Sequence, residues 1–100
     1  MYARNLAVGG SIRAAIVGAG YIADFHARAI KAAHGVDLAA VCDVNATAVE
    51  AFAKSWGVPA YTSLETMLAE QRLDVVHVLV PPDLHHKVAK TALEAGVSIL

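Results

Sequence analysis

Two glycines, Gly18 and Gly20, end an apolar run and come directly before a helix-like pattern. With Ala23 they form the spacing G-x-G-x-x-A, in which the third small residue lets a helix pack closely on a strand. The first glycine permits a tight turn, and the second lets N–H groups at the helix N-terminus approach a phosphate. A simple Gly-x-Gly turn between a strand and a helix is equally open at this point.

An acidic residue separates these two interpretations. Asp43 follows a second apolar run, 20 positions after Ala23, where an acidic residue accepts hydrogen bonds from an adenosine ribose. A carboxylate there would repel a 2′-phosphate, which favours NAD over NADP. Asp43 could instead be an ordinary turn or helix-capping residue, since Asn45 lies nearby. The combined features favour a dinucleotide site. Its predicted members are Gly18, Gly20, Tyr21 and Ile22 at the pyrophosphate and Asp43 at the ribose.

Apolar runs alternate with helical patterns from residue 12 to the end of the chain. This alternation predicts an α/β fold, a doubly wound parallel sheet with crossover helices on both faces. With the first strand central, the strand order is 3-2-1-4-5, the Rossmann arrangement, and the glycine motif lies where the order reverses. The expected strands cover residues 12–17, 38–42, 60–61, 75–80 and 97–100. The expected helices cover residues 21–34, 46–56, 64–70 and 84–95. The N-terminal caps of the last three helices are expected to be Asn45, Thr62 and Asp83, in that order.

Apolar residues at helical spacing predict which face of each helix is buried. On the outer face of the first helix, Asp24 precedes Arg28 by four residues, the order that favours an ion pair. The expected inward residues are Ile22, Phe25, Ala29, Ile30 and Ala33 in the first helix, Val49, Phe52, Ala53 and Trp56 in the second, and Leu84, Val88, Ala92 and Ala95 in the last.

The composition limits the class of protein. The 100 residues are 57% hydrophobic, with a mean hydropathy of +0.51 and a formal net charge of -1. This fits strands buried on both faces, or a chain whose apolar surface another part covers. Scattered Lys and Arg indicate no nucleic-acid or membrane partner, and we expect a cytoplasmic location. Residues 1–11 are expected to be a flexible lead-in and residues 12–100 one dinucleotide-binding domain.

Five histidines and one cysteine are the other groups that could do chemistry. His85 and His86 are adjacent and cannot share one helix face, and no Cys/His spacing resembles a zinc site, so no metal site is predicted. His26 and His77 are predicted to be structural. Strand alternation turns Cys42 away from the ribose site and into packing. No pair of nucleophile and base is found, so no catalytic residue is predicted.

The chain from Ile12 to Leu100 resembles the N-terminal domain of the Gfo/Idh/MocA oxidoreductases, the glucose–fructose oxidoreductase and inositol dehydrogenase family. The segments that carry the resemblance are GAGYIADFHARAI, LAAVCDVN and VPPDLHHKVAKTALEAGVSIL. The last is similar to the family's T-P-N-x-x-H segment, although Val80 and Pro82 replace its threonine and asparagine. The resemblance implies that Val80, Pro81 and His85 line the adenine-to-nicotinamide side of the cofactor.

The same resemblance implies hydride transfer between NAD and a sugar, cyclitol or related polyol. The chain is expected to be truncated, because it ends before the lysine of the family's E-K-P motif and before the second domain. In the family that domain binds substrate and supplies the catalytic histidine and aspartate, so catalysis by these residues alone is not expected. A homo-oligomer is expected. An uncovered fifth strand would invite association with another chain. A non-catalytic nucleotide-binding module or fragment, and a different Rossmann dehydrogenase, remain open alternatives.

Overall fold

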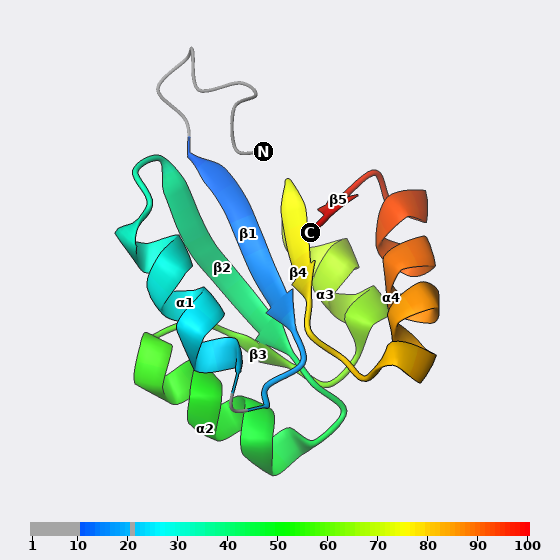
Figure 1. Cartoon of the computed structure of the whole chain (residues 1–100), viewed down its shortest axis with the longest axis horizontal. Coiled ribbons are helices and arrows are strands. Elements are labelled where there is room, and N and C mark those ends of the chain that lie inside the picture. The colour runs from blue at the N-terminus through cyan, green and yellow to red at the C-terminus, as the bar shows by residue number, and fades with distance from the viewer. Residues whose placement is uncertain (1–10, 21) are drawn as a thin grey trace.

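The computed structural model describes residues 11–20 and 22–100, and they form one sheet with helices on both faces (Figure 1). The elements in chain order are β1 (Ile12–Val17), α1 (Ala23–Ala32), β2 (Val36–Cys42), α2 (Ala46–Trp56), β3 (Ala60–Tyr61), α3 (Leu64–Glu70), β4 (Val75–Val78), α4 (Pro82–Glu94) and β5 (Ser98–Ile99). The strand order is β3-β2-β1-β4-β5 and all pairs are parallel. The predicted doubly wound Rossmann sheet of order 3-2-1-4-5 is therefore confirmed. Apart from Ser11, the predicted lead-in lies outside the described residues.

Alternation along the strands sends side chains into two cores, one on each face of the sheet. Ile16 of β1 lies in the core under α1 and α2, together with Val49. Val76 of β4 lies in the core under α3 and α4, together with Ala92. The separation of the helices into these two pairs is visible in Figure 1. Central strands buried on both faces account for much of the hydrophobic share of the sequence.

A β-bulge in β2 sets the direction of the residues that follow it. The register with β1 shifts between Ala14 and Ala15, which leaves Ala39 as the extra residue of β2. After the bulge, Cys42 faces the core under α3 and α4. The next residue, Asp43, is turned toward the connection between β1 and α1. Cys42 and Asp43 therefore point in opposite directions, as predicted.

Several helix ends differ from those predicted. The first helix covers Ala23–Ala32 and is shorter at both ends than expected. Ser63, rather than Thr62, caps α3, and its hydroxyl accepts a backbone N–H one turn later at 3.2 Å. Helix α4 begins at Pro82, because the fixed φ of proline suits a first helical position, so Asp83 lies in the first turn and is not the cap. Among the described residues, no helix is long and apolar enough to cross a bilayer.

The fourth strand ends earlier than predicted. It stops at Val78, so Val80 lies in the connection to α4 and not in a strand. Leu79 still donates its N–H to the Val17 carbonyl at 2.8 Å. Pairing stops soon afterwards because Pro81 has no N–H to donate to a ladder. Strand β2 begins two residues earlier than expected, and β5 is shorter.

Small residues form most of the buried faces of α1 and α4. The prediction from apolar spacing is confirmed for Ile30 and Ala92 and is wrong for Phe25 and Leu84. In α1, Ala23, Ala27 and Ile30 are buried, whereas Phe25 is 68% exposed. In α4, alanines are again buried and Leu84 is exposed. Small side chains let a helix lie close to the sheet at native packing density, and the larger residues then remain outside. Helix α2 follows the prediction, with its aromatic residues packed at the edge of the core.

Candidate dinucleotide-binding site

The carboxyl ends of β1, β2 and β4 meet at one edge of the sheet, where the strand order reverses. Three connections leave this edge: residues 18–22 lead to α1, residues 43–45 to α2, and residues 79–81 to α4. The Gly18 N–H donates to the Cys42 carbonyl at 2.8 Å and thereby joins the first connection to the end of β2. Ligands of open α/β sheets bind at this kind of switch point. The edge is therefore the candidate site.

Gly18 is required by the contact between two of these connections. Its φ is +108°, in a region that L side chains rarely adopt, and it is buried. A Cβ on this residue would lie 2.7 Å from the carbonyl oxygen of Leu79. The motif predicted a tight turn at Gly18, and the structure adds a close approach of the 79–81 connection. The sequence contains no signal for that second requirement, since it depends on a residue far along the chain.

Gly20 has a different role from Gly18. Its φ is not in the left-handed region, and an added Cβ would have no atom within 4 Å. The fold itself therefore does not need glycine at this position. Open space on this side of the loop is what the close approach of a phosphate to the backbone needs. The structure thus fits the pyrophosphate cradle that the sequence favoured over a bare turn.

The N-terminus of α1 offers hydrogen-bond donors. Asn45 and Ser63 cap α2 and α3 with their side chains, whereas Ile22 before α1 makes no side-chain cap. Within residues 11–20 and 22–100, the N–H groups of Gly20 and Ile22 have no hydrogen-bond acceptor. Free N–H groups at a helix start, with their partial positive charge, bind anions such as pyrophosphate. Tyr21, also predicted at this position, lies outside the described residues.

Asp43 connects the first two loops through its carboxylate. Its Oδ2 accepts the Ala19 N–H at 2.7 Å, and its Oδ1 accepts the Asn45 N–H at 2.9 Å. The turn role that the sequence left open for Asp43 is therefore real. Each carboxylate oxygen has a second lone pair, so the half-buried group keeps the capacity to accept ribose hydroxyls. Asp43 holds the glycine loop and faces the same edge of the sheet.

Large apolar side chains are exposed around this edge. Val44, next to Asp43, is 87% exposed, and Ile22 is 48% exposed. Phe25 and Leu84, in the first turns of α1 and α4, are exposed as well. A single exposed apolar residue needs no explanation, but a group at one edge indicates a surface that another molecule or domain contacts.

The structure does not bring His85 to the glycine loop in any contact among the described residues. His85 is exposed on α4 and lines an open groove together with Leu93 and Ile99, on the β5 side of the helix. Val80 is half-buried against the core under α3 and α4, and Pro81 is exposed at the start of α4. These three residues share the 79–85 segment that leaves the site, and their contact with a cofactor stays a prediction.

Two other histidines form a pair between α1 and β4. The Nδ1 atoms of His26 and His77 lie 3.4 Å apart, and their rings are T-shaped, with centroids separated by 5.6 Å. His77 is only 5% exposed. In a hydrogen bond between them, one Nδ1 carries the proton and donates it, and the other Nδ1 is unprotonated and accepts. Only one proton can therefore lie between the two atoms. The structural role predicted for both residues agrees with this contact.

The pair makes stability depend on pH. Burial, and to a smaller extent the neighbouring His26, lower the pKa of His77 below the ordinary histidine value. Below pH ~6.5 the unfolded chain therefore binds more protons at this residue than the folded chain. The His77 contribution is fully present above that pH and declines as the pH falls toward the folded-state pKa. We expect the free energy of unfolding to fall less steeply between about pH 7 and 5 in His77→Phe than in the wild type.

Urea titrations at several pH values test this, with His86→Gln as the control, since His86 is exposed on α4. The same pH slope in His77→Phe and in the wild type would contradict the assignment.

Cys42 is not a candidate nucleophile. Its side chain is buried, and burial, followed by the charges of Asp43 and Glu65, raises the pKa of its thiol to about 11. The thiol therefore stays protonated at neutral pH, and a thiolate is the reactive form of cysteine. The packing role predicted for Cys42 is confirmed.

Residues 12–100 match the model of the oxidoreductase family with an NAD-binding Rossmann fold. The chain belongs to the Gfo/Idh/MocA family. It is 34% identical over 91 residues to D-glucoside 3-dehydrogenase of Escherichia coli, covering 89% of this chain and 26% of the relative. It is 35% identical over 92 residues to inositol 2-dehydrogenase of Corynebacterium glutamicum, covering 90% and 27%. The resemblance recognised in the sequence is therefore confirmed.

The fold also matches solved Gfo/Idh/MocA structures. One is the WlbA dehydrogenase from Bordetella pertussis, solved in complex with NADH and UDP-GlcNAcA. The TM-score is 0.84 at 31% identity, over 89% of this chain and 28% of that one. The chain spans about a quarter of the length of the curated relatives it matches, and that part is the NAD-binding Rossmann domain.

Proposed function

We propose that this domain binds NAD(H) at the carboxyl edge of its sheet. The observation that carries the proposal is the uncapped start of α1 beside the open side of Gly20. Asp43, held by two backbone N–H groups at the next strand end, adds an acceptor for ribose hydroxyls. The proposed contacts are Gly18, Gly20, Tyr21 and Ile22 with the pyrophosphate, Asp43 with the adenosine ribose, and Val80, Pro81 and His85 with the adenine-to-nicotinamide side.

The protein that contains this domain is proposed to oxidise or reduce a sugar, cyclitol or related polyol at a hydroxyl-bearing carbon. The nicotinamide supplies the hydride chemistry, and the protein supplies position and a proton path. The matched relatives named for action on a glucoside and on inositol support this substrate class. Residues 12–100 contribute cofactor binding, and the substrate pocket and proton relay are proposed to come from outside them.

NAD(H) is proposed as the preferred cofactor. A 2′-phosphate would lie beside the Asp43 carboxylate, and the adjacent Val44 is apolar and exposed, so it offers no positive charge. We expect NADH to bind at least about tenfold more tightly than NADPH, equivalent to roughly 1.4 kcal/mol. Calorimetric titration of the native protein with each cofactor measures the ratio, and Asp43→Asn should reduce it. Equal or reversed affinities would contradict the role of Asp43.

The enzymatic proposal is tested by incubating the native protein with NAD and a panel of free sugars, nucleotide sugars and cyclitols. We expect nicotinamide reduction with at least one member of the panel. NADH binding without turnover across the panel would favour the alternative of a non-catalytic nucleotide-binding module. No NADH binding would contradict both.

We further infer that the protein works in the cytoplasm as a homo-oligomer. Exposed large apolar side chains on this domain, such as Leu93, favour association. The scattered charges of the chain suggest neither a nucleic acid nor a membrane as partner. Light scattering of the native protein tests the oligomer, and a monomer would contradict it.

A further inference from the structure

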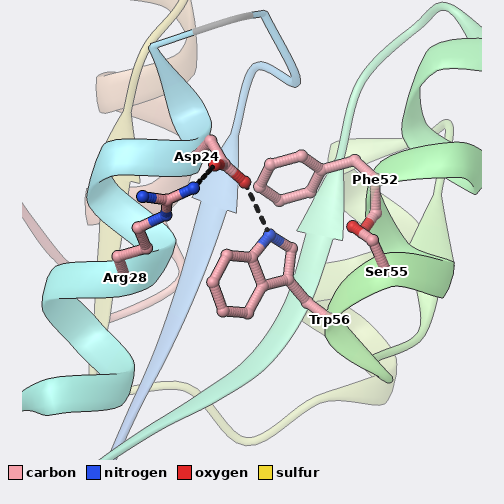
Figure 2. Close-up of polar contacts among 5 residues, drawn as sticks. All are labelled: Asp24, Arg28, Phe52, Ser55 and Trp56. Carbon is pink, nitrogen blue, oxygen red and sulfur yellow. Dashed lines mark hydrogen bonds and ion pairs between the residues drawn. The ribbon is translucent and has the colours of Figure 1, made fainter.

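A hydrogen bond joins the first turn of α1 to the last turn of α2 (Figure 2). The indole N–H of Trp56 donates to Asp24 Oδ1 at 3.2 Å, and Asp24 Oδ2 pairs with the Arg28 guanidinium at 3.0 Å. The ion pair was predicted from the sequence, and the indole contact was not. Figure 2 shows the Asp24 carboxylate between its two partners, each of its oxygens directed at a different one. The Trp56 ring also packs near Phe52, with centroids 6.4 Å apart.

This contact acts on the helix turn that the proposed pyrophosphate site uses. Asp24 is the second residue of α1, directly after the free N–H groups at the start of the helix. Among the described side chains, two polar contacts tie this turn to other elements: Asp24 to α2 and His26 to β4. Ile22 and Phe25 are exposed and give the turn little support from outside. Besides the packing of Ala23 in the core, the direction of the free N–H groups therefore depends on these two polar contacts.

The charge of Asp24 and its hydrogen bond have opposite expected effects on an anionic cofactor. A carboxylate in the first turn favours the helix dipole but repels a bound pyrophosphate. Arg28 offsets that charge, although the pair is largely exposed, which keeps the pairing weak. The hydrogen bond from Trp56, in contrast, fixes the helix start relative to α2. The two effects can be separated by substitution, because an asparagine side chain keeps the oxygen acceptor and loses the charge.

We propose that Asp24 is a positioning residue for cofactor binding, which acts through the Trp56 hydrogen bond to hold the N–H groups at the start of α1 in their binding direction. The inference rests on the pyrophosphate site proposed above. Asp24 itself does not contact the cofactor. Cofactor affinity should therefore follow the indole hydrogen bond and not the carboxylate charge.

The test is the dissociation constant for NADH of the native protein and three variants, measured by calorimetry. Trp56→Phe keeps an aromatic ring and removes the donor, and we expect a dissociation constant about fivefold higher, in line with one lost hydrogen bond. Asp24→Asn keeps the acceptor, and its constant should stay within about twofold of the wild type or fall below it. Asp37→Asn is the matched control for charge, since Asp37 is exposed near the start of β2. It should bind as the wild type does.

Wild-type binding is measured first, because its failure would overturn the proposed function and this inference with it. When the wild type binds, three further outcomes bear on Asp24 alone. A Trp56→Phe variant with lower thermal stability and wild-type affinity would show a merely structural contact. Tighter binding in Asp24→Asn together with wild-type binding in Trp56→Phe would assign the effect of Asp24 to its charge. Either result would overturn the inference, and the expected split between the two variants would support it.

A second measurement does not depend on how Trp56→Phe folds. In ¹⁵N-labelled wild-type protein, the indole N–H resonance of Trp56 reports directly on the hydrogen bond to Asp24. Assignment can come from the backbone of the labelled protein or from loss of the signal in the variant. We expect this resonance to have the position of a hydrogen-bonded indole in both the free and the NADH-saturated protein, since the bond holds the helix start in its binding direction. A resonance at the position of an indole N–H bonded only to water, in either state, would overturn the inference.

Discussion

Replacing Gly20 with valine should abolish NADH binding and leave the fold intact. A Cβ at this position meets no atom within 4 Å, and the backbone is not left-handed, so the folded domain has room for a side chain. The added isopropyl group would occupy the space through which a pyrophosphate approaches the N–H groups of α1. We expect the dissociation constant for NADH to rise by more than about 100-fold, equivalent to roughly 3 kcal/mol. Calorimetry measures the loss, and circular dichroism confirms the fold.

Gly20→Ala provides the graded comparison for this variant. Its single methyl group fills less of the space, so its loss of affinity should be smaller than that of Gly20→Val. If the Gly20→Val protein folds and binds NADH as the wild type does, the glycine pair is only a simple turn between β1 and α1 and not a phosphate site.

Replacing Gly18 with alanine should destabilise the domain itself. The alanine Cβ would lie 2.7 Å from the Leu79 carbonyl oxygen, and φ at this residue is +108°. The atom opposite the new methyl group is backbone, so relief requires a shift of the connection between β4 and α4. We expect the free energy of unfolding to fall by about 3 kcal/mol, from the strained backbone and the overpacking together. Urea denaturation followed by circular dichroism measures this change.

The matched control is Gly20→Ala, the same chemical change two residues away. It should unfold within about 0.5 kcal/mol of the wild type, as expected for a surface substitution without a clash. Comparable destabilisation by the two alanines would mean that the Leu79 contact does not distinguish Gly18 from Gly20.

Local patterns were sufficient to predict the sheet. The strand Ile12–Val17 is a continuous apolar run because helices cover it on both faces, and its bounds agree with the prediction. Even the two-residue strand Ala60–Tyr61 could be placed, because Pro59 and the next helix start delimit it. The Asn45 cap could also be predicted, because its side chain accepts a hydrogen bond from a backbone N–H only three residues later. In each case the decisive interactions are close in the sequence or depend on burial alone.

Contacts between distant segments could not be predicted in the same way. Phe25 has the spacing of a buried residue. However, alanines form the face of α1 that packs on the sheet, so the Phe25 ring remains exposed. The contact of Gly18 with Leu79 and that of Asp24 with Trp56 join different connections and helices. Sequence spacing does not show which residues of two distant segments contact one another. The bulge at Ala39 was missed for the same reason, since it is visible only in the pairing with β1.

The candidate site also contains residues that the sequence identifies and contacts that only the structure shows. Gly18, Gly20 and Asp43 were identified from motif spacing, and the structure brings them to one edge of the sheet. That the Asp43 carboxylate holds the Ala19 N–H was not foreseen, because the spacing predicts only the neighbourhood of the two loops. His85 came from family resemblance alone, and no described contact joins it to the loop. A motif thus locates the binding edge, whereas the tertiary contacts decide which residue supports which loop.

A crystal structure of the native protein grown with NADH tests the central claim most directly. We expect the pyrophosphate to lie against the N–H groups of Gly20 and Ile22, and the Asp43 carboxylate to lie within hydrogen-bond distance of the adenosine ribose hydroxyls. The Trp56 indole should still donate to Asp24 in the same crystal. Pyrophosphate bound away from the start of α1, or a ribose out of reach of Asp43, would contradict the account.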